Sequence, residues 1–163
     1  MGIKHPQVTI HVKGYDEPMI LELFEDKAPK TVRNFMLLAT SGYYQGAIFH
    51  RIIKNFMIQG GAGKGDARSI VGEFAENGFP GNDILHERGV ISMARTSVPD
   101  SASSQFFIMH KTSAHLDGKY AAFGQMVSGY GTLDQIASVA TGRNDKPVTD
   151  VIIESVGVTD FNG

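Results

Sequence analysis

The sequence predicts a mostly β fold: a closed, eight-stranded antiparallel β-barrel with two capping α-helices. Three observations support this prediction. Short runs of alternating apolar and polar residues recur along the chain, only two segments space apolar residues as a helix does, and 19 of the 163 residues are glycine. Glycine at this frequency without a collagen repeat indicates many turns, and closure of the sheet would hide its strand edges.

Composition narrows the class of protein. A chain of 163 residues suits one domain, taken here as residues 1–163. The longest apolar run, residues 35–39, is far shorter than the roughly 20 residues of a membrane helix. The first twenty residues lack the apolar stretch of a secretory signal, so we expect a cytoplasmic protein that does not bind membranes. A formal charge of -2 without blocks of like charge disfavours nucleic acid as a partner.

The chain begins with a predicted β-hairpin, followed by a helix. Residues 8–12 alternate between apolar and polar side chains, and so do residues 19–24 after an intervening turn. Pro29 suits the first position of a helix, and Gly42 is a stop signal. Between them lies an apolar stripe at i, i+3, i+4 and i+7, formed by Val32, Phe35, Met36 and Ala39.

Residues 49–60 are predicted to form two short strands whose register the pattern leaves open. A three-residue loop at residues 54–56 would set Arg51 opposite Gln59, on the same face of the sheet as Met57. A two-residue loop would place them on different faces. The register therefore decides which of these side chains could act together.

A long loop is predicted over residues 60–89, with at most one short strand near residues 69–74. Its glycine-rich start, residues 60–65, satisfies neither common nucleotide-binding glycine motif and is interpreted as a flexible turn. The second helical stripe consists of Leu133, Ile136, Ala137 and Ala140, and Gly142 closes it. The remaining strands are predicted at residues 90–94, 105–109, 121–127 and 148–158.

Several kinds of catalytic site are excluded. The chain has no cysteine, so it has no disulfide, no thiolate nucleophile and no cysteine-ligated metal. Its six histidines do not pair at helical metal-binding spacings, and no serine lies in a Gly-x-Ser-x-Gly turn. We therefore expect neither a metal nor a cofactor.

Two segments place polar residues among large apolar ones. In FHRIIKNFMIQGG, residues 49–61, Arg51 and Gln59 occupy strand positions, and in SSQFFI, residues 103–108, Gln105 precedes two phenylalanines. Taken one strand at a time, Arg51 and Gln59 would simply line the outer, solvent-facing side of a half-buried sheet.

Together with GVISMA at residues 89–94 and LDGK at residues 116–119, these segments resemble the cyclophilin family of peptidyl-prolyl cis-trans isomerases. The resemblance runs in motif order from Val8 to Val158, and its short loops are similar to those of bacterial members. It implies an eight-stranded antiparallel barrel with two helices. It also implies an enzyme that accelerates rotation about X-Pro bonds without a cofactor.

The resemblance implies roles for individual residues. Arg51 would be the catalytic arginine, and Gln59 would assist it as a polar positioning group, as would Gln105. The apolar pocket for the proline ring would be formed by Phe56, Met57, Phe107 and Leu116.

Four further positions would contact the ligand. The backbone of Ala94 and Arg95 would pair with the bound peptide, although Arg95 replaces a common asparagine. His115 stands where many members have a tryptophan that contributes to cyclosporin binding, and Tyr120 stands where many have a pocket-lining histidine. We therefore expect ordinary isomerase activity with only weak cyclosporin binding.

The expected partners are proline-containing peptides in unfolded or folding proteins, and we expect the enzyme to be a monomer. A fixed arginine suits the reaction, because a twisted X-Pro amide gains a lone pair on nitrogen, which a positively charged donor stabilises.

Two other functions are considered. A non-catalytic peptide-binding module with the same groove is the alternative. A small-molecule-binding β-barrel is a third hypothesis, but the sequence predicts no closed lumen for it.

Overall fold

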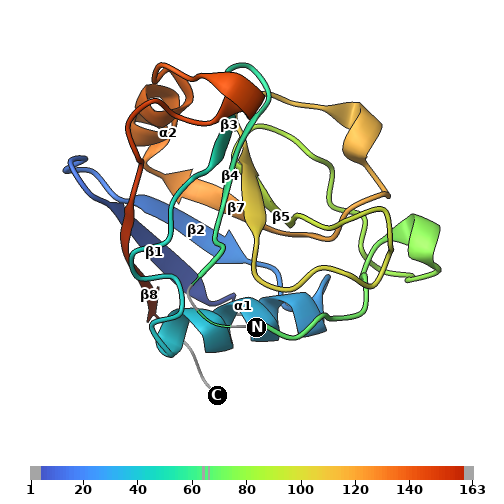
Figure 1. The fold of residues 1–163 in the computed structure, drawn as a ribbon. Helices are drawn as coiled ribbons and strands as arrows, with labels where there is room; N and C mark the ends of the chain where they lie inside the picture. Colours follow the sequence, from blue (N-terminus) through green and yellow to red (C-terminus); the bar gives the residue numbers. More distant parts are fainter. Residues whose placement is uncertain (1–4, 64, 66, 160–163) are drawn as a thin grey trace.

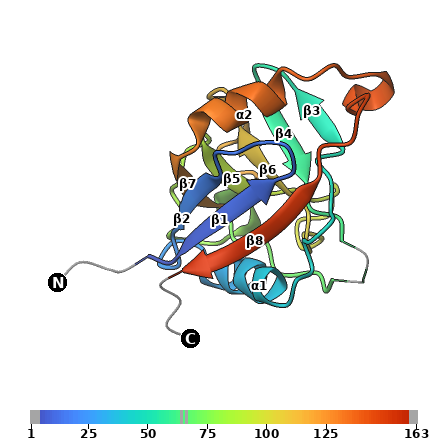
Figure 2. The same cartoon turned by 90° about the vertical axis from the view of Figure 1, so that its left-hand side faces the viewer.

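The computed structural model describes residues 5–63, 65 and 67–159, which form one antiparallel sheet and two α-helices (Figures 1 and 2). The ends of the predicted domain, residues 1–4 and 160–163, and residues 64 and 66 of its glycine-rich loop lie outside this description. The helices are α1 (Pro29–Thr40) and α2 (Tyr130–Ala137). The strands are β1 (Gln7–Val12), β2 (Met19–Leu23), β3 (Arg51–Ile53), β4 (Met57–Gly60), β5 (Val90–Met93), β6 (Phe106–Met109), β7 (Ala122–Ser128) and β8 (Ile153–Thr159). No helix in the described part of the chain is long and apolar enough to cross a membrane.

The sheet is strongly curled but open, so the prediction of a closed barrel is wrong. Its strand order is β3-β4-β6-β5-β7-β2-β1-β8, which leaves β3 and β8 as edges. Strand β3 has only three residues, and the segment before it, rather than β3 itself, meets the start of β8. There Ile48 bridges Ile152, and the Phe49 amide donates to the Val151 carbonyl at 3.0 Å. These contacts tie the segment before β3 to the start of β8, and no ladder forms between the edge strands β3 and β8.

The two helices lie at opposite ends of the curled sheet, as expected (Figures 1 and 2). The apolar stripe predicted for α1 is buried against the sheet. Its Phe35 lies in an aromatic cluster, with ring centroids 5.4 Å from Phe106, 5.3 Å from Phe123 and 5.2 Å from Tyr44. This cluster forms the centre of the main core, because these side chains project from β6, β7 and the α1–β3 connection toward one another.

Strands β3 and β4 form a hairpin with the three-residue loop that the sequence left as one of two options. Arg51 pairs with Gln59 and Ile53 pairs with Met57. The loop residue Asn55 has φ 65°, a left-handed conformation that asparagine tolerates better than most residues. Its amide bonds to Nδ1 of His110 at 2.9 Å. The loop thus fixes the register on which the site depends.

The second half of the chain differs from the prediction at two boundaries. Helix α2 ends at Ala137 instead of near Ala140, and β8 begins at Ile153 instead of residue 148. Between them the chain turns through three 3-10 residues, Arg143–Asp145, and the Val148 amide bonds to the Ala140 carbonyl at 2.9 Å. The connection between α2 and β8 therefore includes residues 138–140 and 148–152, which periodicity alone assigned to the helix and the strand.

The long loop after β4 contains a short 3-10 helix, Ala75–Asn77, and no strand over residues 69–74. Its Glu73 is fully buried at the N-terminus of α1, where it accepts hydrogen bonds from the Thr31 amide at 2.7 Å and the Thr31 hydroxyl at 2.6 Å. A carboxylate at this end of a helix accepts hydrogen bonds from the free amides and interacts favourably with the positive end of the helix dipole. Glu73 therefore holds the loop against the first turn of α1.

Candidate active site

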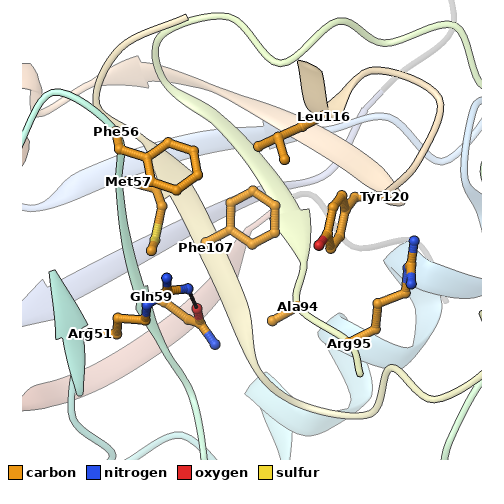
Figure 3. A pocket seen from close by; sticks show the side chains of 9 residues that line it. All are labelled: Arg51, Phe56, Met57, Gln59, Ala94, Arg95, Phe107, Leu116 and Tyr120. Atoms are coloured by element: carbon orange, nitrogen blue, oxygen red, sulfur yellow. Dashed lines mark hydrogen bonds between the residues drawn. The ribbon is translucent and has the colours of Figure 1, made fainter. Parts of the chain in front are cut away.

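A pocket opens on the outer face of the curled sheet, on the side away from the main core (Figure 3). Successive residues of a strand point to opposite faces, so Phe106 of β6 enters the main core while Phe107 enters a second, smaller apolar cluster. All nine residues that line the pocket belong to the predicted site: Arg51, Phe56, Met57, Gln59, Ala94, Arg95, Phe107, Leu116 and Tyr120. Arg51 and Gln59 thus do lie on the outer face, and this face is partly apolar.

The hairpin register brings the two polar residues of β3 and β4 together. Nη1 of Arg51 donates to Oε1 of Gln59 at 3.5 Å, a long hydrogen bond that Figure 3 shows as a dashed line. Gln59 in turn donates from Nε2 to Oε1 of Gln105 at 3.2 Å. The Arg51 side chain is exposed at the pocket mouth, so its remaining donors are free to meet a ligand.

Phe107 forms the floor of the pocket and is only 5% exposed. Its ring meets Tyr120 edge-on, with centroids 5.6 Å apart. Met57 and Leu116 belong to the same apolar cluster, and Phe56 packs against it. Figure 3 shows these side chains around one hollow, with Arg51 and Gln59 on one side and Tyr120 on the other. The hollow combines an apolar base with a cation at its edge.

A buried histidine that the sequence analysis did not identify lies beneath this floor. The His86 ring is stacked on Phe107 at 6.0 Å with an interplanar angle of 17°. Nδ1 lies 3.1 Å from Oδ1 of Asp117, and Nε2 lies 2.9 Å from Oγ of Ser92. Burial lowers the pKa of His86, and the hydrogen bond that the ring donates to Asp117 opposes this shift. Neutral imidazole fits both contacts if Nδ1 donates to the carboxylate and Nε2 accepts from the hydroxyl.

His86 therefore connects the pocket floor to the loop that carries Leu116. Its backbone amide also donates to Oδ1 of Asp117, at 2.6 Å. Asp117 directly follows Leu116, so the same carboxylate holds one pocket wall in place. His86 lies in the long aperiodic segment, where the sequence carries no signal for a buried polar contact.

Ala94 and Arg95 border the pocket at the end of β5. The Ala94 amide donates to the Gln105 carbonyl at 3.0 Å, so the Ala94 carbonyl is the group left to pair with a peptide. The guanidinium of Arg95 lies between two rings, with its Cζ 4.7 Å from the centroid of Phe74 and 4.6 Å from that of Tyr120. The side chain that replaces a common asparagine is therefore part of the pocket wall.

Two predicted site residues lie beside the pocket rather than in it. Gln105 lines an adjoining hollow, together with Gln59, Ala94, Arg95, Thr96, Ser101 and Ser103. His115 is exposed on a 3-10 helix, Ala114–Leu116, with its ring 5.8 Å from that of Phe56. Among the aromatic pairs of the described residues, His115 thus reaches the rim through Phe56.

Comparison with known proteins gives consistent results. A family model described as cyclophilin type peptidyl-prolyl cis-trans isomerase/CLD matches residues 7–158. The chain is 38% identical to peptidyl-prolyl cis-trans isomerase B of Escherichia coli, over 94% of this chain and 99% of that protein. It is 41% identical to a putative bifunctional phosphatase/peptidyl-prolyl cis-trans isomerase of Streptococcus pyogenes, but it spans only 39% of that longer protein.

Solved structures agree with these sequence matches. The crystal structure of a cyclophilin type peptidyl-prolyl cis-trans isomerase from Cryptosporidium parvum superimposes with a TM-score of 0.85 and 32% identity, covering 96% of this chain and 99% of that one. The same Cryptosporidium protein in the presence of the dipeptide Ala-Pro gives a TM-score of 0.83 and 33% identity, covering 95% of this chain and 99% of that one.

Proposed function

The chain belongs to the cyclophilin-type peptidyl-prolyl cis-trans isomerases, and we propose that it carries out this reaction in the pocket beside β3 and β4, with Arg51 as the catalytic residue. The observation that carries the proposal is the position of Arg51: an exposed cation held at the edge of an apolar hollow. Such a hollow suits a proline ring, which has no charge and no amide N–H.

The reaction is a rotation, in which no covalent bond forms or breaks. Amide resonance sets a barrier of about 20 kcal/mol for the X-Pro bond, and twisting removes that resonance. The proline nitrogen then becomes pyramidal and gains a lone pair. A donor aimed at this nitrogen binds the twisted state more tightly than either planar state, so it lowers the barrier.

Arg51 has the properties that this step requires. A guanidinium stays protonated at every physiological pH and carries five N–H donors in one plane. One donor is directed to Gln59, which is itself bonded to Gln105, so the guanidinium is oriented from one side. Its other donors can reach a substrate whose ring lies over Phe107.

We propose X-Pro segments of unfolded or folding proteins as the substrates. The pocket is open to solvent along its rim, where Arg51 is exposed and Tyr120 is half-buried, so a proline within a continuous chain can enter it. The Cryptosporidium parvum relative was crystallised in the presence of the dipeptide Ala-Pro, which is the smallest segment of this kind.

Cyclosporin binding is proposed to be weak. His115 stands at the position where many family members carry tryptophan, and it is exposed. In the described residues, the aromatic ring paired with it is that of Phe56, at the rim of the pocket. Imidazole offers a bulky apolar ligand less surface than indole does.

The function is tested by exchange measurements on an X-Pro peptide without a coupled protease. Two-dimensional NMR exchange spectroscopy reads the cis-trans rate directly at equilibrium. We expect catalytic amounts of the protein to accelerate exchange. A folded protein that binds the peptide without changing its exchange rate would instead be a binding module.

A further inference from the structure

The groove around the candidate site carries positive charge only. The residues that line the pocket and the adjoining hollow include two charged side chains, Arg51 and Arg95, and no carboxylate. Arg95 borders both hollows, so it lies where a peptide leaving the proline pocket would pass. The exposed residue Lys119 lies in the neighbouring loop, and its backbone carbonyl accepts a hydrogen bond from Arg95.

The Arg95 guanidinium is fixed in place but not neutralised. Its Nε and Nη2 donate to the Lys119 carbonyl, and Nη1 donates to the Thr96 carbonyl at 3.0 Å. These bonds use three of its five N–H donors. Arg88, by contrast, forms a two-pronged ion pair with Asp134, at 2.8 and 3.1 Å. Among the described residues no carboxylate forms such a pair with Arg95.

Two carboxylates on the segments beside Arg95, those of Asp100 and Asp117, are engaged elsewhere. Asp100 accepts hydrogen bonds from the Gly72 amide and the Asn77 side chain, both at 2.9 Å. Asp117 accepts bonds from the amide and ring of His86. Neither carboxylate bonds to the guanidinium, and among the described residues Arg95 forms no ion pair, so it keeps two N–H donors at the edge of the groove.

We propose that Arg95 makes this enzyme prefer proline segments that carry an acidic side chain close to the X-Pro bond. This inference rests on the proposed function of the same groove and adds a substrate class to it. The rings of Phe74 and Tyr120 and the two carbonyls hold the guanidinium in one position. An acidic residue of the peptide therefore meets a preorganised cation and loses little additional entropy.

The test uses peptides that differ only in one charge. Three otherwise identical X-Pro peptides carry Glu, Gln or Lys, placed in turn before and after the proline, and kcat/KM is measured by NMR exchange. We expect the Glu peptide to exceed the Lys peptide by about 3- to 10-fold at low ionic strength in the better of the two placements, as for one or two exposed charge pairs. The Glu:Lys ratio should shrink in 0.5 M NaCl, because the Debye screening length falls to about 5 Å at this salt concentration and exposed charge pairs weaken.

Variants identify the side chain responsible. Arg95→Gln should reduce the Glu:Lys ratio at least 2-fold, with each rate compared with that of the Gln peptide for the same variant, whereas Arg95→Lys should keep most of the ratio. Lys13→Gln removes one exposed cation at the end of β1, away from the pocket, and should change nothing.

The outcomes are separable. An unchanged Glu:Lys ratio in Arg95→Gln, or the same decrease in Lys13→Gln, would overturn the proposed preference while leaving the isomerase assignment intact. No acceleration of any peptide by the wild-type protein would overturn the proposed function itself.

Discussion

Arg51 and Gln59 face each other across the β3–β4 hairpin, with Nη1 of the arginine 3.5 Å from Oε1 of the glutamine. This pairing depends on the loop at residues 54–56, since a change of one residue in a hairpin register moves a strand's side chains to the opposite face. Asn55 provides the left-handed turn that the loop needs. The geometry of the proposed catalytic arginine and its glutamine partner thus originates in a local turn preference.

Phe107→Ala should weaken both stability and peptide binding. The side chain is 5% exposed and packs against His86 and Tyr120, so truncation should reduce the free energy of unfolding by about 3 kcal/mol. The lost floor should also raise the Kd for an X-Pro peptide. Urea unfolding and peptide titration by NMR measure the two effects.

Phe107→Leu is the matched control, because leucine refills most of the volume with an apolar side chain. It should lose less stability than Phe107→Ala. Unchanged stability together with unchanged affinity in Phe107→Ala would show that this ring does not form the floor.

The histidines His5 and His86 should titrate on opposite sides of 6.5, the ordinary histidine value. Burial lowers the pKa of His86 despite its bond to Asp117. For His5, burial acts to lower the pKa, but hydrogen bonds to Glu22 at 2.6 Å and Asp26 at 2.8 Å outweigh it and raise the pKa. One NMR titration of the ring protons measures both values.

These shifts make opposite contributions to the pH dependence of stability. The unfolded chain takes up a proton on residue 86 before the folded protein does, so this residue destabilises the fold as pH falls below about 6.5. His5 contributes stability below about 6.5, and this contribution disappears as pH rises through its raised folded pKa. His5→Gln should therefore lose stability mainly at acidic pH. A His86 pKa at or above 6.5 would contradict the buried, neutral imidazole.

His115→Trp should strengthen inhibition by cyclosporin and leave isomerisation of a short peptide nearly unchanged. The larger indole would add apolar surface and a fixed N–H donor at the rim beside Phe56. Inhibition curves of the two proteins with the same peptide measure the effect. Superimposable curves would show that position 115 does not control affinity for the cyclic ligand.

The sequence was sufficient to predict the strands and the residues that line the pocket, but it did not predict that the sheet stays open. Alternation groups Arg51, Met57 and Gln59 on one face for a three-residue loop, whereas the resemblance to the family placed Phe107 beside them. Closure depends instead on how far each edge strand extends. That length is set here by the short β3 and by the turn before β8, and periodicity detects neither.

Long-range polar contacts were also beyond the sequence pattern. Glu73 meets Thr31 across 42 residues, and His86 meets Asp117 across 31. Each partner alone has the composition of an ordinary loop residue. Their burial follows from the tertiary arrangement, which brings a loop against a helix end in one case and beneath the pocket floor in the other.

The most direct test of the proposed mechanism is the rate at which the Arg51→Ala variant catalyses cis-trans exchange of an X-Pro peptide. Arg51 is exposed and makes one long hydrogen bond, so the variant should fold normally, as unfolding curves would verify. Arg33→Ala, at an exposed position of α1, serves as the control for loss of one arginine. We predict that Arg51→Ala lowers kcat/KM for an X-Pro peptide by at least about 100-fold, the effect of removing one transition-state donor, while Arg33→Ala retains wild-type activity. Near-wild-type exchange rates in a folded Arg51→Ala protein would contradict the account.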